Sequence, residues 1–153
     1  MKIIEILSPD MVLPELKGNT KPEVLHELAD SLASKHSEIA PSALLAVLAE
    51  RERLGSTAIG DGIAIPHGKL AGVRSIIGVF GRHVRGVDFD SLDGGLTHLF
   101  FLLVAPEDSA SLHLKALARV SRLMKDPAFR ERLSSAPDAA EIFRLIKEED
   151  ARH

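Results

Sequence analysis

The feature that most constrains the fold is a nearly unbroken apolar run in the second half of the chain. Residues 97–105 read THLFFLLVA. The run is too short to cross a bilayer, and its length and composition suit a strand that is covered on both faces. Such a strand lies inside a sheet, and helices must then cover both faces of that sheet. The run therefore predicts an α/β protein with a buried central strand.

Three further segments have the composition of strands. Residues 74–82 are rich in isoleucine and other β-formers, and residues 56–65 combine small and β-branched residues with glycines that indicate tight turns. Residues 87–90 are expected to form a short strand, and Asp93-Gly94-Gly95 indicates a turn before the apolar run. Together these segments predict a sheet of four or five strands.

Helical spacing of apolar residues predicts five helices around this sheet. Thr20 is suited to cap the first helix, and Asp108 or Ser109 is suited to cap the third. The expected helices cover residues 21–36, 41–55, 109–126, 127–134 and 137–149. Helices before and after the strands predict one domain over residues 1–153, a layered α/β sandwich of a mixed sheet flanked by helices.

The composition argues against several classes of function. The chain has no cysteine, which rules out disulfides and thiolate metal sites. Its formal net charge is −3 with both signs interspersed, and it has no tyrosine or tryptophan, so no nucleic-acid partner is expected. The first residues do not read as a signal peptide, and no stretch reaches membrane-spanning length. We therefore expect a cytoplasmic protein without membrane insertion.

His67 is the first candidate for chemistry. Pro66 fixes the backbone before it, so the imidazole is expected on a rigid turn, and Gly68 is expected to let a partner's backbone or a bulky anion approach. A histidine with a pKa near neutrality can use one ring nitrogen as a nucleophile while a hydrogen bond holds the other. This suits reversible capture of a phosphoryl group. The Pro-His-Gly triplet alone, however, favours a simple turn residue.

A wider window around His67 carries a family signature. Glu52 is followed by six residues, then Ile59-Gly60, two residues, and IAIPHG at residues 63–68. This spacing resembles the phosphorylation-site signature of the fructose/mannitol-type enzyme IIA domains of the bacterial phosphotransferase system. Residues 51–57 and the segment His113-Leu114-x-x-Leu117 also resemble that family. Among its branches, the chain is most similar to the free-standing nitrogen-related enzyme IIA.

The resemblance implies the mannitol-type IIA fold and a single EIIA type 2 domain over residues 1–153. It implies that His67 accepts a phosphoryl group from a phosphorylated HPr-like protein in a phosphoenolpyruvate-dependent phosphotransferase system. In the nitrogen-related branch the phosphorylation state is itself a signal, so a regulatory output through target proteins in nitrogen or potassium metabolism is expected. Positioning and charge neutralisation supply most of the catalysis of phosphoryl transfer, and we expect neither a cofactor nor a metal.

Two side chains are expected beside the phosphoryl group. Arg51 extends the core-facing stripe of its helix towards His67, where a guanidinium can pair with phosphate oxygens. His113 lies on the apolar face of the third predicted helix, and the resemblance implies a second histidine whose N–H binds the phosphoryl oxygens. Spacing alone would favour a solvated arginine and a core histidine at these positions. Ser56 and Thr57 are weaker candidates for hydroxyl donors.

Three other interpretations compete with this one. A sugar-transport IIA component would donate its phosphate to a separate IIB protein, and a regulatory docking module would keep the fold without the chemistry. A metal hydrolase would need His67, His98, His113 and Asp61 to converge on zinc, although no close histidine pair supports such a site. No segment resembles a IIB domain, an HPr-like carrier or a permease, so the phosphate is expected to leave on another protein.

Overall fold

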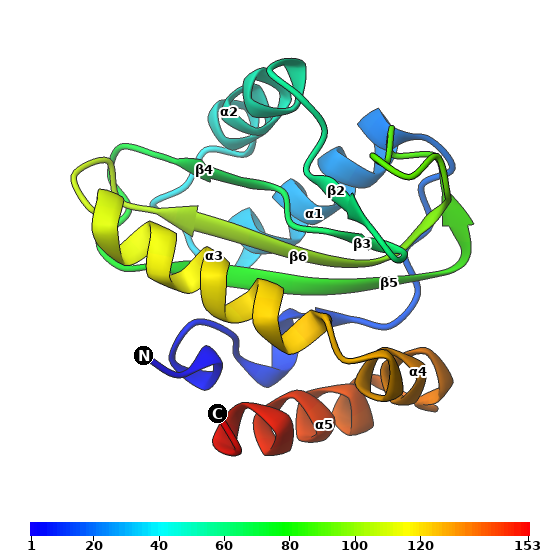
Figure 1. The fold of residues 1–153 in the computed structure, drawn as a ribbon. Coiled ribbons are helices and arrows are strands. Elements are labelled where there is room, and N and C mark those ends of the chain that lie inside the picture. Colours follow the sequence, from blue (N-terminus) through cyan, green and yellow to red (C-terminus); the bar gives the residue numbers. More distant parts are fainter.

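The computed structural model describes residues 1–153 and places a six-stranded mixed sheet among helices (Figure 1). The strands are β1 (Val12–Leu13), β2 (Ala58–Gly60), β3 (Ile63–Ala64), β4 (His67–Lys69), β5 (Ile77–Val87) and β6 (Thr97–Ala105). The α-helices are α1 (Lys21–Lys35), α2 (Pro41–Arg53), α3 (Ala110–Met124), α4 (Pro127–Ser135) and α5 (Ala139–Ala151). Two short 3-10 helices, Ile3–Glu5 and Pro9–Met11, precede β1. The predicted layered α/β sandwich is confirmed.

The apolar run forms β6, and the rest of the sheet is arranged around this strand. β6 pairs with β5 in antiparallel register on one side, and on its other side it pairs in parallel with β3 and then β4. β1 extends the sheet beyond β5, and β2 extends it beyond β3. All residues of β6 except His98 are buried. The central, buried position predicted for this run is therefore confirmed.

The sheet differs from the prediction in its strand count and at one edge. β1 was not predicted, because the two residues that pair with β5 are too few to carry a periodic signal. Residues 87–90 are not a separate strand, since Val87 ends β5 and the chain then leaves the sheet. Asp90 adopts a φ of 55°, which is incompatible with extended backbone, and this explains why no strand forms there.

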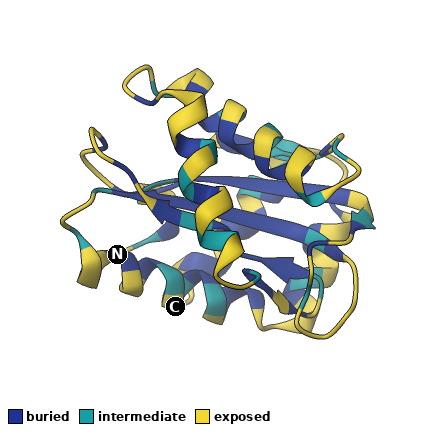
Figure 2. Ribbon diagram, turned by 90° about the horizontal axis from the view of Figure 1, so that it is seen from above, coloured by how far each residue is buried: buried dark blue, intermediate teal, exposed yellow.

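Helices cover both faces of the sheet (Figures 1 and 2). α1 packs against β5 and α2 packs against β4, while α3 crosses the opposite face along β6. α5 packs against β1 and the N-terminal 3-10 helices. The strands are dark blue in Figure 2 where helices lie over them. The five largest fully buried side chains are all phenylalanines, and three of them, Phe80, Phe100 and Phe101, lie in β5 and β6.

Two helices begin differently from the prediction. Ser109 precedes α3, but its hydroxyl donates to the Pro106 carbonyl at 2.7 Å and caps no N–H group. α5 begins at Ala139 and not at Pro137, because Asp138 is its capping residue.

A buried carboxylate joins the two ends of the chain. Asp150, near the end of α5, is 1% exposed. Its Oδ2 accepts the N–H of Ile3 at 2.7 Å, and its Oδ1 pairs with Nε of Arg119 on α3 at 2.7 Å. The N-terminal segment, α3 and α5 are therefore fixed to one another on one side of the sheet.

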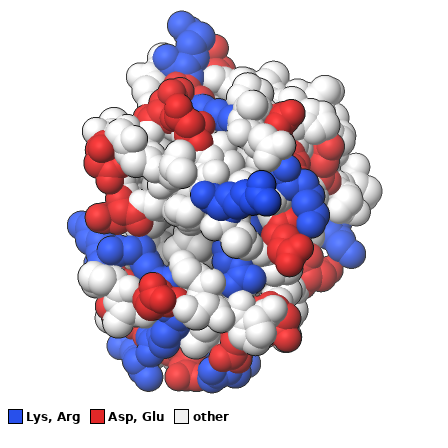
Figure 3. Space-filling view, turned by 90° about the vertical axis from the view of Figure 1, so that its right-hand side faces the viewer, with Lys and Arg blue, Asp and Glu red and all other residues white.

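The surface carries charges of both signs. Seen from the right-hand side of Figure 1, acidic and basic side chains alternate around uncharged areas, without a large patch of one sign on that face (Figure 3). None of the helices combines the length and the apolar character that a membrane-spanning helix requires.

Candidate functional site

His67 is the first residue of β4, and the expectation that it lies on a turn is wrong. β4 pairs with β6, and His67 lies opposite Leu103. The carbonyl of Pro66 accepts the N–H of Leu103 at 3.0 Å, so the proline joins the pairing through the one hydrogen-bonding group that it has. His67 is therefore fixed by extended backbone that is anchored to the most buried strand of the protein.

Gly68 has a structural role that the sequence did not predict. A Cβ atom at this position would lie 2.4 Å from Cγ1 of Val47, which belongs to α2. The space that a side chain would need is therefore filled by the protein's own helix. Because Gly68 lets α2 approach β4 so closely, it brings the end of that helix next to His67.

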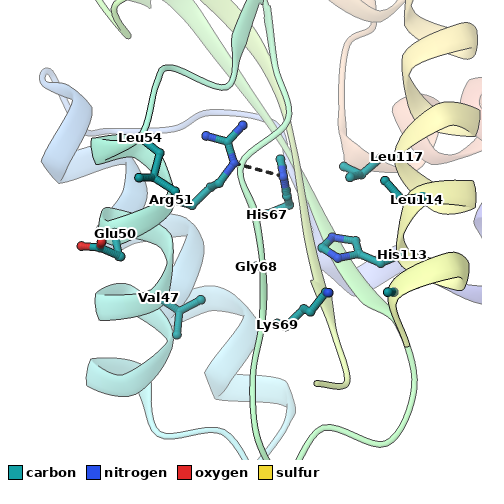
Figure 4. Close-up of a pocket in the computed structure, with 11 residues that line it drawn as sticks. Val47, Glu50, Arg51, Leu54, His67, Gly68, Lys69, His113, Leu114 and Leu117 are labelled. Atoms are coloured by element: carbon teal, nitrogen blue, oxygen red, sulfur yellow. Dashed lines mark hydrogen bonds between the residues drawn. The ribbon is translucent and has the colours of Figure 1, made fainter. Parts of the chain in front are cut away.

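The hydrogen bonds of His67 define which ring nitrogen carries the proton. Nδ1 lies 2.8 Å from the carbonyl oxygen of Ile65, and a carbonyl can only accept, so Nδ1 carries the hydrogen. Nε of Arg51 lies 3.3 Å from Nε2 of His67 (Figure 4), and an arginine can only donate, so Nε2 presents its lone pair. Both partners favour the same tautomer. Nε2 is thus the nitrogen that can act as a nucleophile.

Arg51 lies in the last turn of α2, where the sequence placed it beside His67. Besides the contact with Nε2 of His67, its Nη1 donates to the carbonyl of Gly55 at 2.8 Å. The second bond fixes the guanidinium plane, and Nη2 forms no hydrogen bond within the protein. The structure therefore places a fixed cation with free donor capacity directly at the nucleophilic nitrogen.

His113 lies in the first turn of α3 and faces His67 from the other side. The two ring centroids are 5.4 Å apart, and the planes meet at 77°. His113 is buried, and its Nε2 has no hydrogen-bond partner in the protein. An unpaired buried nitrogen is costly, so this group is suited to bind something that the protein itself does not supply.

Burial and nearby charge keep both histidines neutral near physiological pH. Burial lowers the pKa of His67, and the charge of Arg51 lowers it further, while the bond to the Ile65 carbonyl and the charge of Glu52 act in the opposite direction. Burial, followed by the electrostatic interactions with His67 and Lys69, lowers the pKa of His113 to about 4. A neutral His67 retains the lone pair that nucleophilic attack requires.

The two histidines and Arg51 line a single pocket of about 470 Å³ between α2, β4 and α3 (Figure 4). Lys69 lines the same pocket, and its side chain is directed towards His113. Lys69 is not among the site residues predicted from the sequence. Its position two residues after His67 in a strand places both side chains on the same face, and this period of two was the signal available in the sequence. The remaining lining residues are Val47, Glu50, Leu54, Gly68, Ala110, Leu114 and Leu117.

Ser56 and Thr57 lie near His67 but use their hydroxyl groups elsewhere. Together with His67 they line a smaller pocket of about 230 Å³. The Ser56 hydroxyl donates to the carbonyl of Phe89 at 2.7 Å, and the Thr57 hydroxyl donates to the carboxylate of Glu52. Their role as hydroxyl donors to a phosphate remains a prediction, and it would require these two bonds to break.

The four residues of the metal-hydrolase alternative do not converge. Asp61 and His98 line a different pocket from the one that contains His67 and His113. His98 directs Nδ1 to the carbonyl of His83 at 3.1 Å. No group of three or more histidine, cysteine, aspartate or glutamate side chains is arranged to hold a metal ion. This geometry does not fit the zinc site that the alternative requires.

The chain is similar in sequence to known proteins of one family. The profile of the family described as "Phosphoenolpyruvate-dependent sugar phosphotransferase system, EIIA 2" matches residues 5–149. A nitrogen regulatory protein of Bradyrhizobium diazoefficiens is 43% identical over 146 residues, which are 95% of this chain and 95% of that protein. The fructose-specific EIIABC component of Bacillus subtilis is 35% identical over 150 residues, which are 98% of this chain but 24% of that longer protein.

The structural comparison gives the same result as the sequence comparison. The crystal structure of the nitrogen regulatory protein IIA-Ntr from Neisseria meningitidis superposes with a TM-score of 0.88 at 32% sequence identity. The superposition covers 94% of this chain and 98% of the Neisseria chain. The similarity therefore extends over nearly the whole of both proteins.

Proposed function

The chain belongs to the EIIA 2 family of the phosphoenolpyruvate-dependent sugar phosphotransferase system, and on that premise we propose that it is a phosphocarrier that accepts a phosphoryl group on Nε2 of His67. The observation that carries this proposal is the hydrogen bonding of the imidazole. Nδ1 is held by the Ile65 carbonyl at 2.8 Å, and Nε2 presents its lone pair to the pocket beside Arg51. A ring held in this way is ready for attack without a change of tautomer.

The donor in this proposal is a phosphorylated HPr-like protein that carries its phosphate on a histidine. The lone pair of Nε2 forms a bond to phosphorus while the bond between phosphorus and the donor nitrogen breaks, and that electron pair returns to the donor ring. His67 keeps its proton on Nδ1, so its ring becomes cationic when the phosphoryl group is attached. The bond from Nδ1 to the Ile65 carbonyl then becomes charge-assisted and stabilises the product.

Three groups around His67 are suited to bind the phosphoryl oxygens, and they differ in charge. Arg51 lies at Nε2 and supplies a cation, and Lys69 supplies a second cation from the same pocket. His113 remains neutral at physiological pH because its pKa is lowered to about 4, so it contributes an N–H donor and not a charge. Two cations and one neutral donor can balance a dianionic phosphoryl group without binding it so tightly that onward transfer stops.

The names of the relatives support a regulatory output. The Bradyrhizobium and Neisseria proteins are both nitrogen regulatory proteins, and the Bradyrhizobium protein matches this chain over nearly its full length. We infer that phosphorylation of His67 is read by target proteins in nitrogen or potassium metabolism. The Bacillus relative, a fructose-specific component, favours a second candidate function, in which a IIB protein takes the phosphate for sugar uptake.

The test is incubation of the protein with enzyme I, an HPr-like carrier and phosphoenolpyruvate, followed by intact mass measurement. The wild type is expected to gain one acid-labile phosphoryl group, and the His67→Ala variant is expected to gain none. The His98→Ala variant is the control, because His98 lies in a separate pocket. Equal labelling of the His67 variant and the wild type would refute the assignment. A wild type that no carrier labels would instead support the docking-module alternative.

A further inference from the structure

We propose that Glu52 is a positioning residue that holds the His67 ring in its reactive orientation through a continuous chain of hydrogen bonds. Glu52 follows Arg51 in α2, but its carboxylate is directed into the protein and its side chain is only 5% exposed. The inference concerns the site of the proposed function and rests on that function for its catalytic consequence.

The carboxylate of Glu52 is held by three groups from two other segments. Oε1 accepts the N–H of Thr57 at 3.0 Å, and the hydroxyl of Thr57 donates to Oε2. The ammonium of Lys21, at the start of α1, lies 3.0 Å from Oε1, and the Lys21 side chain is 15% exposed. A buried carboxylate with this many partners is fixed in position, and so is the backbone of the segment to which it binds.

The hydrogen bonds continue from Thr57 to His67. The carbonyl of Thr57 accepts the N–H of Ile65 at 3.1 Å. The carbonyl of the same Ile65 accepts Nδ1–H of His67 at 2.8 Å. Glu52 thus fixes Thr57, Thr57 fixes Ile65, and Ile65 selects the tautomer in which Nε2 carries no hydrogen. Metal-binding histidines are oriented in a comparable way by the groups behind them, and loss of such groups reduces activity.

The charges of Glu52 and Arg51 have opposite effects on the pKa of His67. The carboxylate raises the pKa of His67, whereas burial and the guanidinium of Arg51 lower it. The His67 ring becomes cationic when it is phosphorylated, so a nearby negative charge stabilises the product ring while Arg51 binds the phosphoryl oxygens. Two adjacent residues of α2 therefore act on the same phosphohistidine, Glu52 on the imidazole ring and Arg51 on the phosphoryl group.

The first test is an NMR titration of the His67 ring in the wild type and in Glu52→Gln. The charged groups that act on His67 or line its pocket are Glu50, Arg51, Glu52 and Lys69, and they are accompanied by neutral His113. Loss of the Glu52 charge is expected to lower the pKa of His67 by about half a unit. Phosphoryl acceptance from the HPr-like carrier is expected to slow about tenfold. An unchanged His67 pKa and an unchanged rate in a folded variant would overturn the proposal.

Asp150→Asn is the matched control, because Asp150 is also a buried carboxylate that accepts a backbone N–H and pairs with a cation. It lies in a different part of the fold, so its loss is expected to reduce stability without moving the His67 titration. If the Asp150 variant shifts the His67 pKa as much as Glu52→Gln does, the effect is general destabilisation and the proposal fails.

Lys21→Met provides a test that does not depend on the folding of Glu52→Gln. Removal of the ammonium leaves the Glu52 charge uncompensated, so the pKa of His67 is expected to rise, opposite to the effect of Glu52→Gln. A fall or no change in the Lys21 variant would contradict the proposal. The titrations also separate this inference from the proposed function, because they require no phosphoryl donor. A wild type that no carrier phosphorylates would refute the function and leave the titration result intact.

Discussion

Substitution of Gly68 by alanine tests how closely α2 must approach β4 for the site to form. The added Cβ would lie 2.4 Å from Cγ1 of Val47, whereas carbon atoms in favourable contact are about 3.5–4.0 Å apart. Valine in a helix has one strongly preferred side-chain rotamer, so Val47 cannot swing aside at low cost. The helix must therefore shift by roughly 1 Å, and Arg51, one turn further along the same face, must move with it.

The expected cost of this overpacking is about 1–3 kcal/mol in the free energy of unfolding. Backbone strain adds nothing to this value, because Gly68 does not adopt a positive φ. The Val47→Ala substitution removes the clashing methyl group and leaves Cβ of residue 47 at 3.8 Å, which is an ordinary contact distance. On its own, Val47→Ala is expected to cost about 1 kcal/mol. The double variant is expected to be about as stable as Val47→Ala alone.

Urea unfolding of the four proteins in this cycle measures these free energies, and phosphoryl acceptance from the HPr-like carrier reports the position of Arg51. Gly68→Ala is expected to lose both stability and rate, whereas the double variant is expected to match the stability of Val47→Ala and to recover most of the rate. If Gly68→Ala is as stable as the wild type, or if the two substitutions are additive, α2 and β4 are not in the close contact described above.

Three further predictions concern the groups around the pocket. The free energy of unfolding should be constant above about pH 6.5 and should fall as the pH drops towards 4, because unfolded His113 takes up a proton near its ordinary pKa while folded His113 does so only at about 4. Thermal melts over this range measure the dependence of stability on pH, and His113→Gln should make that dependence weaker. Arg51→Lys keeps the charge but loses the planar donor group, so the rate of phosphoryl transfer from the carrier should be roughly 10- to 100-fold slower. The same substitution at the exposed neighbour, Arg53→Lys, should change this rate little. Lys69→Gln should lower the fraction of phosphorylated protein at equilibrium with the carrier, measured by intact mass, whereas substitution of the exposed Lys115 by glutamine should not. Equal phosphorylated fractions in Lys69→Gln and the wild type would show that Lys69 does not bind the phosphoryl group.

The buried strand and the helices could be predicted because their signals are long and periodic. The apolar run of β6 and the helical stripes each extend over several turns or alternations, and the structure keeps them where the sequence placed them. Short elements carry too few residues for such a pattern. β1 exists because β5 offers an edge for parallel pairing, and β4 exists because β6 offers another, which is information held in the tertiary structure.

The site could likewise be predicted only in part. The convergence of Arg51, His67 and His113 was predicted from the family signature, and neither composition nor spacing alone would have favoured it. The role of Gly68 could not be predicted, because the clash with Val47 depends on a helix 21 residues earlier in the chain. Lys69 could have been included if residues 67–69 had been interpreted as a strand, since alternate residues of a strand share a face.

The tautomer of His67 is the central claim, and the ring nitrogen that receives the phosphoryl group tests it most directly. Uniformly 15N-labelled protein, phosphorylated by enzyme I, the HPr-like carrier and phosphoenolpyruvate, can be studied by long-range 1H–15N correlation NMR. We predict that phosphorus is bonded to Nε2 of His67 and that Nδ1 keeps its hydrogen, held by the Ile65 carbonyl. A phosphoryl group on Nδ1 of His67, or on any other histidine, would contradict the account.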